Sequence, residues 1–200
     1  MTRTPARGKS GSIPVEEMVD SATKLAEQAH RGQFRKQTGE EFIEHPRAVA
    51  EIVATFTSDP ETISAAYLHD VLEKTDVNAS QLRQRFGDLV AEVVIACTED
   101  PSISCYADRK RDLRRKAISA GRPALTIYAA DRVANLRDWT NLDAGERAAV
   151  GAKLGTDFEE RLLLWREDLV DLSQADPELP CLAEIEIELG HLLNVSNEAA

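Results

Sequence analysis

Apolar residues recur at helical spacing along most of the chain, and no stretch shows the strict apolar–polar alternation of a strand. In the first such segment, apolar residues lie three and four positions apart from Val15 to Ala29. Proline suits the first turn of a helix and glycine suits its end. We therefore expect a helix that begins at Pro14 and is closed by Gly32, followed by a polar loop over residues 31–44.

Two further helices follow this loop. The first begins near His45 and keeps its apolar face through Val49, Ile52 and Val53. The second starts at residues 59–60, an Asp-Pro pair typical of a helix N-terminus. Its apolar positions lead into an adjacent histidine and aspartate, and we expect this helix to end around residues 74–75.

The rest of the chain repeats the same helical pattern. Asn78 with Gln81 three residues later forms a capping box, which predicts a short helix closed by Gly87. Gly155 is a candidate break inside a long C-terminal segment. The remaining expected helices cover residues 89–97, 109–116, 124–139, 144–172 and 182–194. The pattern predicts an all-α fold, a helical bundle with additional C-terminal helices.

Composition and length fit one globular domain. The chain has 200 residues, 42% of them hydrophobic and 30% charged, which is ordinary for a protein with a full core. Residues 1–12 are polar, basic and rich in glycine, serine and proline, so we expect a disordered arm there. Residues 13–200 are expected to form a single domain.

The net charge of −11 argues against non-specific binding of nucleic acid or of an anionic membrane, because both need a basic surface. A small anionic substrate remains compatible, since a local basic pocket is enough. Cys97, Cys105 and Cys181 lack a paired metal-binding spacing and are read as free thiols. No apolar run has transmembrane length and no secretory signal is evident, which predicts a cytoplasmic protein.

The candidate chemistry centres on His69, Asp70 and Glu73. On one helix these residues are neighbours three and four positions apart, so their side chains can converge. An imidazole beside a carboxylate suits Mn, Fe, Co or Zn. His45 and Asp131, from two other helices, would complete a four-ligand site with room for water. Taken singly, each also fits a capping histidine or an arginine-paired surface acid.

Several segments occur in a characteristic order along the chain. They are AHRGQFRK at 29–36, FIEHP at 42–46, AAYLHDVLE at 65–73, Phe86-Gly87, Thr98, ADR at 130–132 and NLR at 135–137. Together they resemble the HD-superfamily phosphohydrolases, and more closely the alarmone hydrolase domain of the RelA/SpoT family in its small single-domain, Mesh1-like form. The resemblance covers about residues 15–140.

This resemblance implies an activity and a role for each matching residue. Such hydrolases remove the 3′-diphosphate from guanosine tetra- or pentaphosphate and release pyrophosphate. The resemblance implies that a divalent metal, usually Mn²⁺, is held by His45, His69, Asp70 and Asp131. It further implies that the purine nucleotide is bound by Arg35, Lys36 and Asn135.

The chain departs from the family at one catalytic position. The family pattern has Glu-Asp after the His-Asp pair, whereas this chain has Glu73-Lys74. Glu73 is expected to act as the general base. Lys74 has three open roles: it points to solvent, it binds a substrate phosphate, or it displaces metal or water and abolishes turnover. Loss of one acid/base group typically costs about 10²- to 10⁴-fold in rate.

Two alternatives to the hydrolase therefore stay open: a non-catalytic alarmone-binding module, and an HD phosphohydrolase acting on a different nucleotide. The chain ends soon after the match, so we expect no alarmone synthesis. The basic segment 109–116 fits either a solvated helix face or a phosphate funnel at the site. The sequence does not define the oligomeric state.

Overall fold

The structure is a computed structural model that describes residues 13–198, with side chains described up to residue 193. Within these residues it is helical and contains no β-strand, apart from an isolated bridge between Phe34 and Glu41. The all-α prediction is confirmed. In chain order the helices are α1 (Val15–Ala29), α2 (Glu44–Ala54), α3 (Pro60–Leu68), α4 (Val71–Lys74), α5 (Ala79–Phe86), α6 (Asp88–Ala96), α7 (Tyr106–Ser119), α8 (Arg122–Thr140), α9 (Ala144–Leu154), α10 (Phe158–Ala175) and α11 (Leu182–Glu198).

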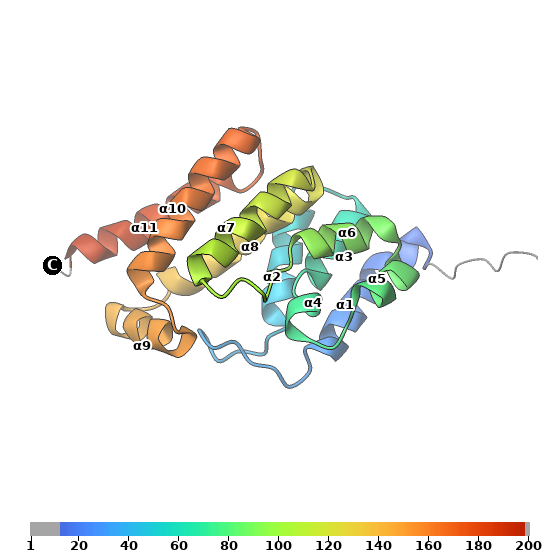
Figure 1. The fold of residues 1–200 in the computed structure, drawn as a ribbon, viewed down its shortest axis with the longest axis horizontal. Coiled ribbons are helices and arrows are strands. Elements are labelled where there is room, and N and C mark those ends of the chain that lie inside the picture. The colour runs from blue at the N-terminus through green and yellow to red at the C-terminus, as the bar shows by residue number, and fades with distance from the viewer. Residues whose placement is uncertain (1–12, 199–200) are drawn as a thin grey trace, which may run out of the picture.

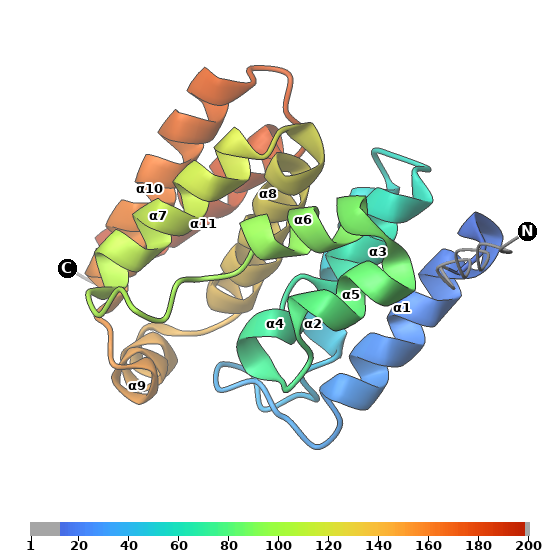
Figure 2. The ribbon, with the colours of Figure 1, turned by 45° about the vertical axis from the view of Figure 1, so that its right-hand side comes forward.

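Two helices, α3 and α8, organise the packing (Figures 1 and 2). Helix α3 packs against α1, α2 and α6, and α8 packs against α2, α7 and α11. Buried residues occur on all sides of α8, as expected for a helix covered all round. Helix α2 contacts both α3 and α8.

Local sequence features set several of the helix ends. Asn78 Oδ1 accepts a hydrogen bond from the Gln81 N–H, and Gln81 Oε1 accepts one from the Asn78 N–H, as the capping-box pattern predicts. Gly87 has φ +91° and separates α5 from α6. Gly155 adopts a left-handed conformation that ends α9, so the expected break in the C-terminal segment is real.

The end of α1 differs from the prediction. The helix ends at Ala29, and the His30 N–H bonds the Ala26 carbonyl at 2.9 Å. Gly32 is therefore not the cap. It lies two residues further on with φ +76°, where it turns the chain into the loop.

The segment before the His-Asp pair also differs. The expectation of one helix from residue 60 to about 75 is wrong, because α3 ends at Leu68 and α4 begins at Val71. A continuous helix would offer the Ala66 carbonyl to the Asp70 N–H. The His69 ring bonds that carbonyl instead, with Nδ1 2.8 Å from the oxygen. His69 and Asp70 therefore lie in a turn between two short helices.

The predicted disordered arm, residues 1–12, lies outside the described residues. Among the described residues, no helix combines the length and the hydropathy needed to cross a bilayer.

Candidate metal centre and its pocket

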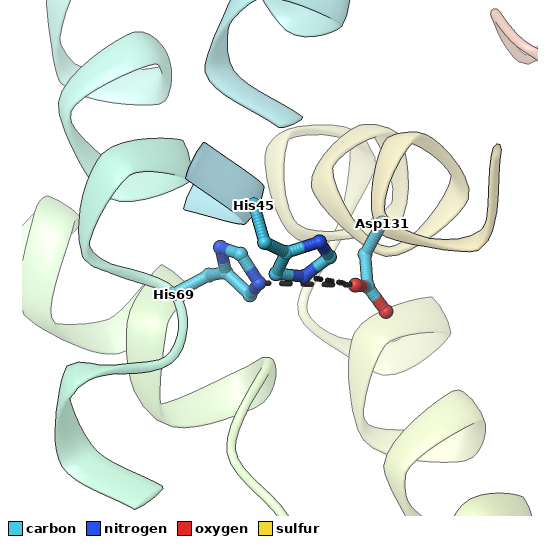
Figure 3. A group of neighbouring side chains, drawn as sticks. All are labelled: His45, His69 and Asp131. Carbon is cyan, nitrogen blue, oxygen red and sulfur yellow. Dashed lines mark ion pairs between the residues drawn. The ribbon is translucent and has the colours of Figure 1, made fainter. Parts of the chain in front are cut away.

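Three elements bring two imidazoles and a carboxylate together (Figure 3). His45 lies in the first turn of α2, His69 in the turn between α3 and α4, and Asp131 in α8. Their ligand atoms all lie within 4.8 Å of one another. His45 Nε2 is 2.9 Å from Asp131 Oδ1, and His69 Nε2 is 3.8 Å from the same oxygen. These separations suit ligands that share one ion at about 2 Å.

The orientation of His69 supports a ligand role. Its Nδ1 is hydrogen-bonded to the Ala66 carbonyl, which places the proton on Nδ1 and leaves Nε2 with a free lone pair. That Nε2 is buried and has no hydrogen-bond partner among the described residues. A buried nitrogen without a partner is costly, and a divalent cation would satisfy it. The residues present therefore fit a divalent metal.

Asp70 lies beside this group without being part of it. Its Oδ2 is 3.6 Å from His69 Nε2 and 3.9 Å from His45 Nε2, so it is within reach of an ion held between the two rings. The structure thus gathers all four residues for which the sequence predicted a ligand role. They come from α2, the α3–α4 turn and α8, and not from a single helical face.

Burial and neighbouring groups together set the protonation of this group of side chains. Burial lowers the pKa of the His45 imidazole, which favours the neutral form that binds metals. Burial raises the pKa of the Asp131 carboxyl, but its hydrogen bond with His45 and the neighbouring charges together outweigh burial, so the pKa lies well below its ordinary value. The pKa of Asp70 is also lowered, because the two neighbouring imidazoles outweigh its burial. These shifts favour the ligand forms of His45, Asp70 and Asp131 near neutral pH.

A cavity of about 360 Å³ opens on the cluster. It is lined by the cluster, by Asp70 and Glu73, and by cationic side chains from several helices. Cys97 also lines it, but its Sγ is hydrogen-bonded to the Ala124 carbonyl, and burial raises the pKa of the thiol to about 12. Cys97 therefore stays protonated and outside the ligand group, and all three cysteines are free, as predicted.

The three residues with an expected nucleotide-binding role meet at this cavity. Arg35 is buried, and its Nη2 contacts Asn135 Oδ1 at 3.1 Å and Asp138 Oδ2 at 2.5 Å. Asn135 in turn donates to Asp131 Oδ1 at 2.7 Å. Lys36 lines the cavity and is exposed. Asn135 thus orients Asp131 of the candidate metal centre, and Arg35 contacts Asn135. The sequence did not predict these contacts.

Glu73 and Lys74 lie in the same cavity. Lys74 Nζ contacts Glu73 Oε1, and the other carboxylate oxygen accepts a 3.4 Å hydrogen bond from the Glu99 N–H. The Lys74 side chain keeps 41% of its surface exposed. Burial opposes its charge, yet Asp70 and Glu73 raise the pKa of Lys74, so it remains a cation beside the expected base.

The basic segment of α7 divides between two directions. Arg109 and Lys110 line the cavity, where both pair with Glu99. Arg111 and Arg114 turn to α10, where both pair with Glu167. The segment is therefore neither a uniform solvated face nor a uniform funnel. Each of these four cations points to the carboxylate that it meets, Glu99 at the cavity or Glu167 on α10.

One wall of the cavity was not predicted. Tyr106, Arg161 and Trp165 line it together with Trp139. Trp139 stacks on Phe158 of α10, with ring centres 5.4 Å apart, and Trp165 meets both rings edge-on. The sequence carries no motif for this wall, because its members are up to 59 positions apart.

A buried ionic network ties this wall to α8. Asp168 of α10 is 2% exposed and pairs with Arg114 Nη1 and Arg132 Nε, each at 2.6 Å. The Tyr128 hydroxyl donates to the same carboxylate at 2.7 Å. Because Arg132 follows Asp131 directly, α10 braces the part of α8 that carries the cluster.

The structure is an all-helical bundle in which two histidines and neighbouring carboxylates surround one buried point. These features define a class of protein, the helical proteins with a candidate divalent-metal centre. The HD domain family matches residues 22–156, and the chain belongs to this family. The resemblance inferred from the sequence is confirmed.

The chain is also similar to named relatives and to a solved structure. A GTP pyrophosphokinase of Streptomyces coelicolor is 36% identical over 122 residues, which are 60% of this chain and 14% of that protein. The guanosine-3′,5′-bis(diphosphate) 3′-pyrophosphohydrolase MESH1 of Danio rerio is 37% identical over 117 residues, covering 57% of this chain and 64% of that one. A solved structure described as a metazoan ortholog of SpoT that hydrolyses ppGpp has a TM-score of 0.68 and 22% identity, over 100% of this chain and 99% of that one. At that identity, the structural match establishes the fold.

Proposed function

We propose that this chain is a divalent-metal-dependent hydrolase that releases pyrophosphate from the 3′-diphosphate of guanosine 3′,5′-bis(diphosphate). The convergence of His45, His69 and Asp131 in one cavity with Glu73 carries this proposal. The names of relatives such as the zebrafish protein support it. The matched segments span only 14% and 64% of the two relatives described above, so the substrate is transferred as a proposal.

Four residues would hold the ion: His45, His69, Asp70 and Asp131. We propose Mn²⁺, because it is one of the ions that mixed imidazole and carboxylate ligation suits and the one that the family resemblance implies. When bound, a divalent ion polarises a phosphoryl oxygen and lowers the pKa of water. The protein's part is to keep the His45 imidazole neutral and both carboxylates ionised, which the pKa shifts described above favour. The Ala66 carbonyl fixes the His69 ring so that its Nε2 faces the ion.

Glu73 is the proposed general base. It accepts a proton from water as the water oxygen forms a bond to the phosphorus attached to the nucleoside 3′-oxygen. The bond between that phosphorus and the 3′-oxygen breaks, pyrophosphate leaves, and the 3′-oxygen takes up a proton. Lys36 and Arg35 would bind the nucleotide. Arg35 would do so from a fixed position, because Asn135 and Asp138 hold it.

A second function has its own supporting observation. Lys74 contacts Glu73 directly, so a cation occupies the base that the reaction needs. A permanent pair would leave a module that binds the alarmone without turnover. We place the hydrolase first, because the 41% exposed Lys74 side chain has room to move towards a substrate phosphate.

Pyrophosphate release with Mn²⁺ tests both functions. We expect turnover by the unmodified protein that stops on chelation, with a changed rate in Lys74→Asp. If the unmodified protein releases no pyrophosphate but Lys74→Asp does, the result would support the binding module. If neither protein releases pyrophosphate and both keep a helical circular dichroism spectrum, the substrate would have to be another 3′-phosphorylated nucleotide.

A ligand variant tests the metal assignment. His69→Ala should lose Mn²⁺ binding and activity together, because Nε2 of His69 is the unpartnered nitrogen of the cluster. His191→Ala is the matched control, since His191 is 64% exposed on α11 beside Glu188. Equilibrium dialysis of both variants separates them. Full Mn²⁺ binding in His69→Ala would overturn the assignment.

We further propose that residues 13–200 act as one domain. One hydrophobic core cluster extends from Met18 in α1 to Leu192 in α11. A cytoplasmic location also remains part of the proposal, because the proposed substrate is a nucleotide. Nucleic acid and membranes are not expected as partners of a chain with net charge −11.

A further inference from the structure

Arg161, in the first turn of α10, has no carboxylate partner among the residues that the structure describes. It lines the cavity together with the metal cluster. Its Nη1 donates to the Tyr106 hydroxyl at 2.9 Å, and its Nε is buried without a hydrogen-bond partner among residues 13–193. No acidic oxygen among those residues lies within ion-pair distance of its guanidinium. Arg161 also lies beyond the part of the chain that matches the HD domain family.

Three buried arginines near the cavity have carboxylate partners. Arg35 pairs with Asp138, Arg132 with Asp168, and Arg114 with three acidic residues of α10. The guanidinium of Arg161 instead stacks on aromatic rings, 4.9 Å from the centre of Tyr106 and 5.4 Å from that of Trp139. Such contacts hold a cation in place but leave its charge without a counter-ion.

More cations surround the same tyrosine. Lys110 Nζ lies 5.6 Å and Arg109 Cζ 5.8 Å from the centre of the Tyr106 ring. Both share one carboxylate, that of Glu99. This wall of the cavity therefore carries three cations and one anion. An anionic ligand would neutralise the excess positive charge of this wall. A guanidinium can bind phosphate oxygens through two N–H groups.

Arg161 and Tyr106 line the same cavity as the cluster but come from other helices. Arg161 belongs to α10 and Tyr106 to α7, whereas the cluster lies on α2, the α3–α4 turn and α8. Helices α4 and α10 lie on different sides of the bundle in both views (Figures 1 and 2). A ligand with two separate anionic groups could engage both regions of one cavity.

We propose that Arg161, oriented by Tyr106 and assisted by Lys110, binds the 5′-diphosphate of the nucleotide while the 3′-diphosphate lies at the metal cluster. This inference rests on the proposed function, which supplies a substrate with two diphosphates. It makes Arg161 a specificity-determining residue. The chain should discriminate nucleotides by what they carry at the 5′ position, the end that the reaction leaves unchanged.

Binding can be measured without turnover, by calorimetry with metal chelated. Guanosine 3′,5′-bis(diphosphate) should bind the unmodified protein about 10- to 100-fold more tightly than guanosine 3′-diphosphate with a free 5′-hydroxyl, as expected for charge-assisted hydrogen bonds. Arg161→Met should remove most of this preference without weakening binding of the 5′-hydroxyl nucleotide. Arg166→Met, at an exposed position of the same helix, should keep it.

Arg161→Lys keeps the charge and most of the packing, so it should fold and retain an intermediate preference. Equal binding of both nucleotides by the unmodified protein, including no binding of either, would overturn the inference. So would equal weakening of both nucleotides in Arg161→Met and Arg161→Lys. If the preference depends on Arg161 but no pyrophosphate is released with Mn²⁺, the proposed function fails and the anion site stands.

Discussion

The buried carboxylate of Asp168 offers a stability prediction that can be worked out from its contacts. Asp168→Asn removes the negative charge that faces Arg114 and Arg132. Arg114 keeps Glu167 and Asp171 as partners, but Arg132 loses the carboxylate with which it pairs. An uncompensated buried charge costs about 3–5 kcal/mol.

The asparagine oxygen can still accept one hydrogen bond, so we expect the lower end of this range, about 3 kcal/mol. For a domain of this size, that lowers Tm by roughly 6–12 °C. Asp171→Asn is the control, because Asp171 is 44% exposed and also pairs with Arg114. An exposed pair contributes about 1 kcal/mol or less.

Urea unfolding followed by circular dichroism measures both free energies, and calorimetry measures both Tm values. Equal losses in Asp168→Asn and Asp171→Asn, or a loss below about 1 kcal/mol in Asp168→Asn, would refute the reasoning from burial and charge.

Three further predictions follow from single contacts. Asn135→Ala should weaken Mn²⁺ binding about 10- to 100-fold in equilibrium dialysis, because Asn135 donates to the carboxylate of Asp131; unchanged affinity would contradict this. Burial raises the pKa of Glu99, but Lys110 and its neighbour Arg109 outweigh burial, so the folded pKa lies below the ordinary 4.5. The stabilisation is complete above pH 4.5 and is lost as the pH falls through the folded pKa. Glu99→Gln should thus be less stable than the unmodified protein at pH 7, with a gap in unfolding free energy that narrows below pH 4.5; a constant gap in urea titrations would disprove this. Asn78→Ala should cost about 1 kcal/mol in urea unfolding through loss of the capping box, and no change would exclude that contribution.

Features that depend on neighbours in sequence were predicted well. The capping box at Asn78 and the left-handed Gly155 both set helix ends as expected, because each acts on backbone groups within a few residues. The all-α fold also followed from local periodicity. The gathering of His45, His69, Asp70 and Asp131 was inferred from their ordered segments and from the family resemblance.

Features that depend on contacts between distant residues were missed. The apolar pattern continues from Leu68 to Leu72 without glycine or proline, so the sequence does not indicate the break between α3 and α4. The structure shows it, together with the bond between the His69 ring and the Ala66 carbonyl. The aromatic wall around Arg161 joins residues from α7, α8 and α10, and no local pattern predicts such a contact. The division of the basic segment likewise depends on which neighbour each side of α7 meets.

The position of Asn135 between Arg35 and Asp131 has a thermodynamic consequence. Its amide contacts the arginine on one side and the carboxylate of the cluster on the other, so the two proposed binding regions share one hydrogen-bonded residue. If a bound ion fixes Asp131 and thereby fixes Arg35, the ion raises the affinity of the protein for the nucleotide. Reciprocity then requires the nucleotide to raise the affinity for the ion by the same factor. We therefore expect each ligand to bind more tightly when the other is present, although either can bind alone.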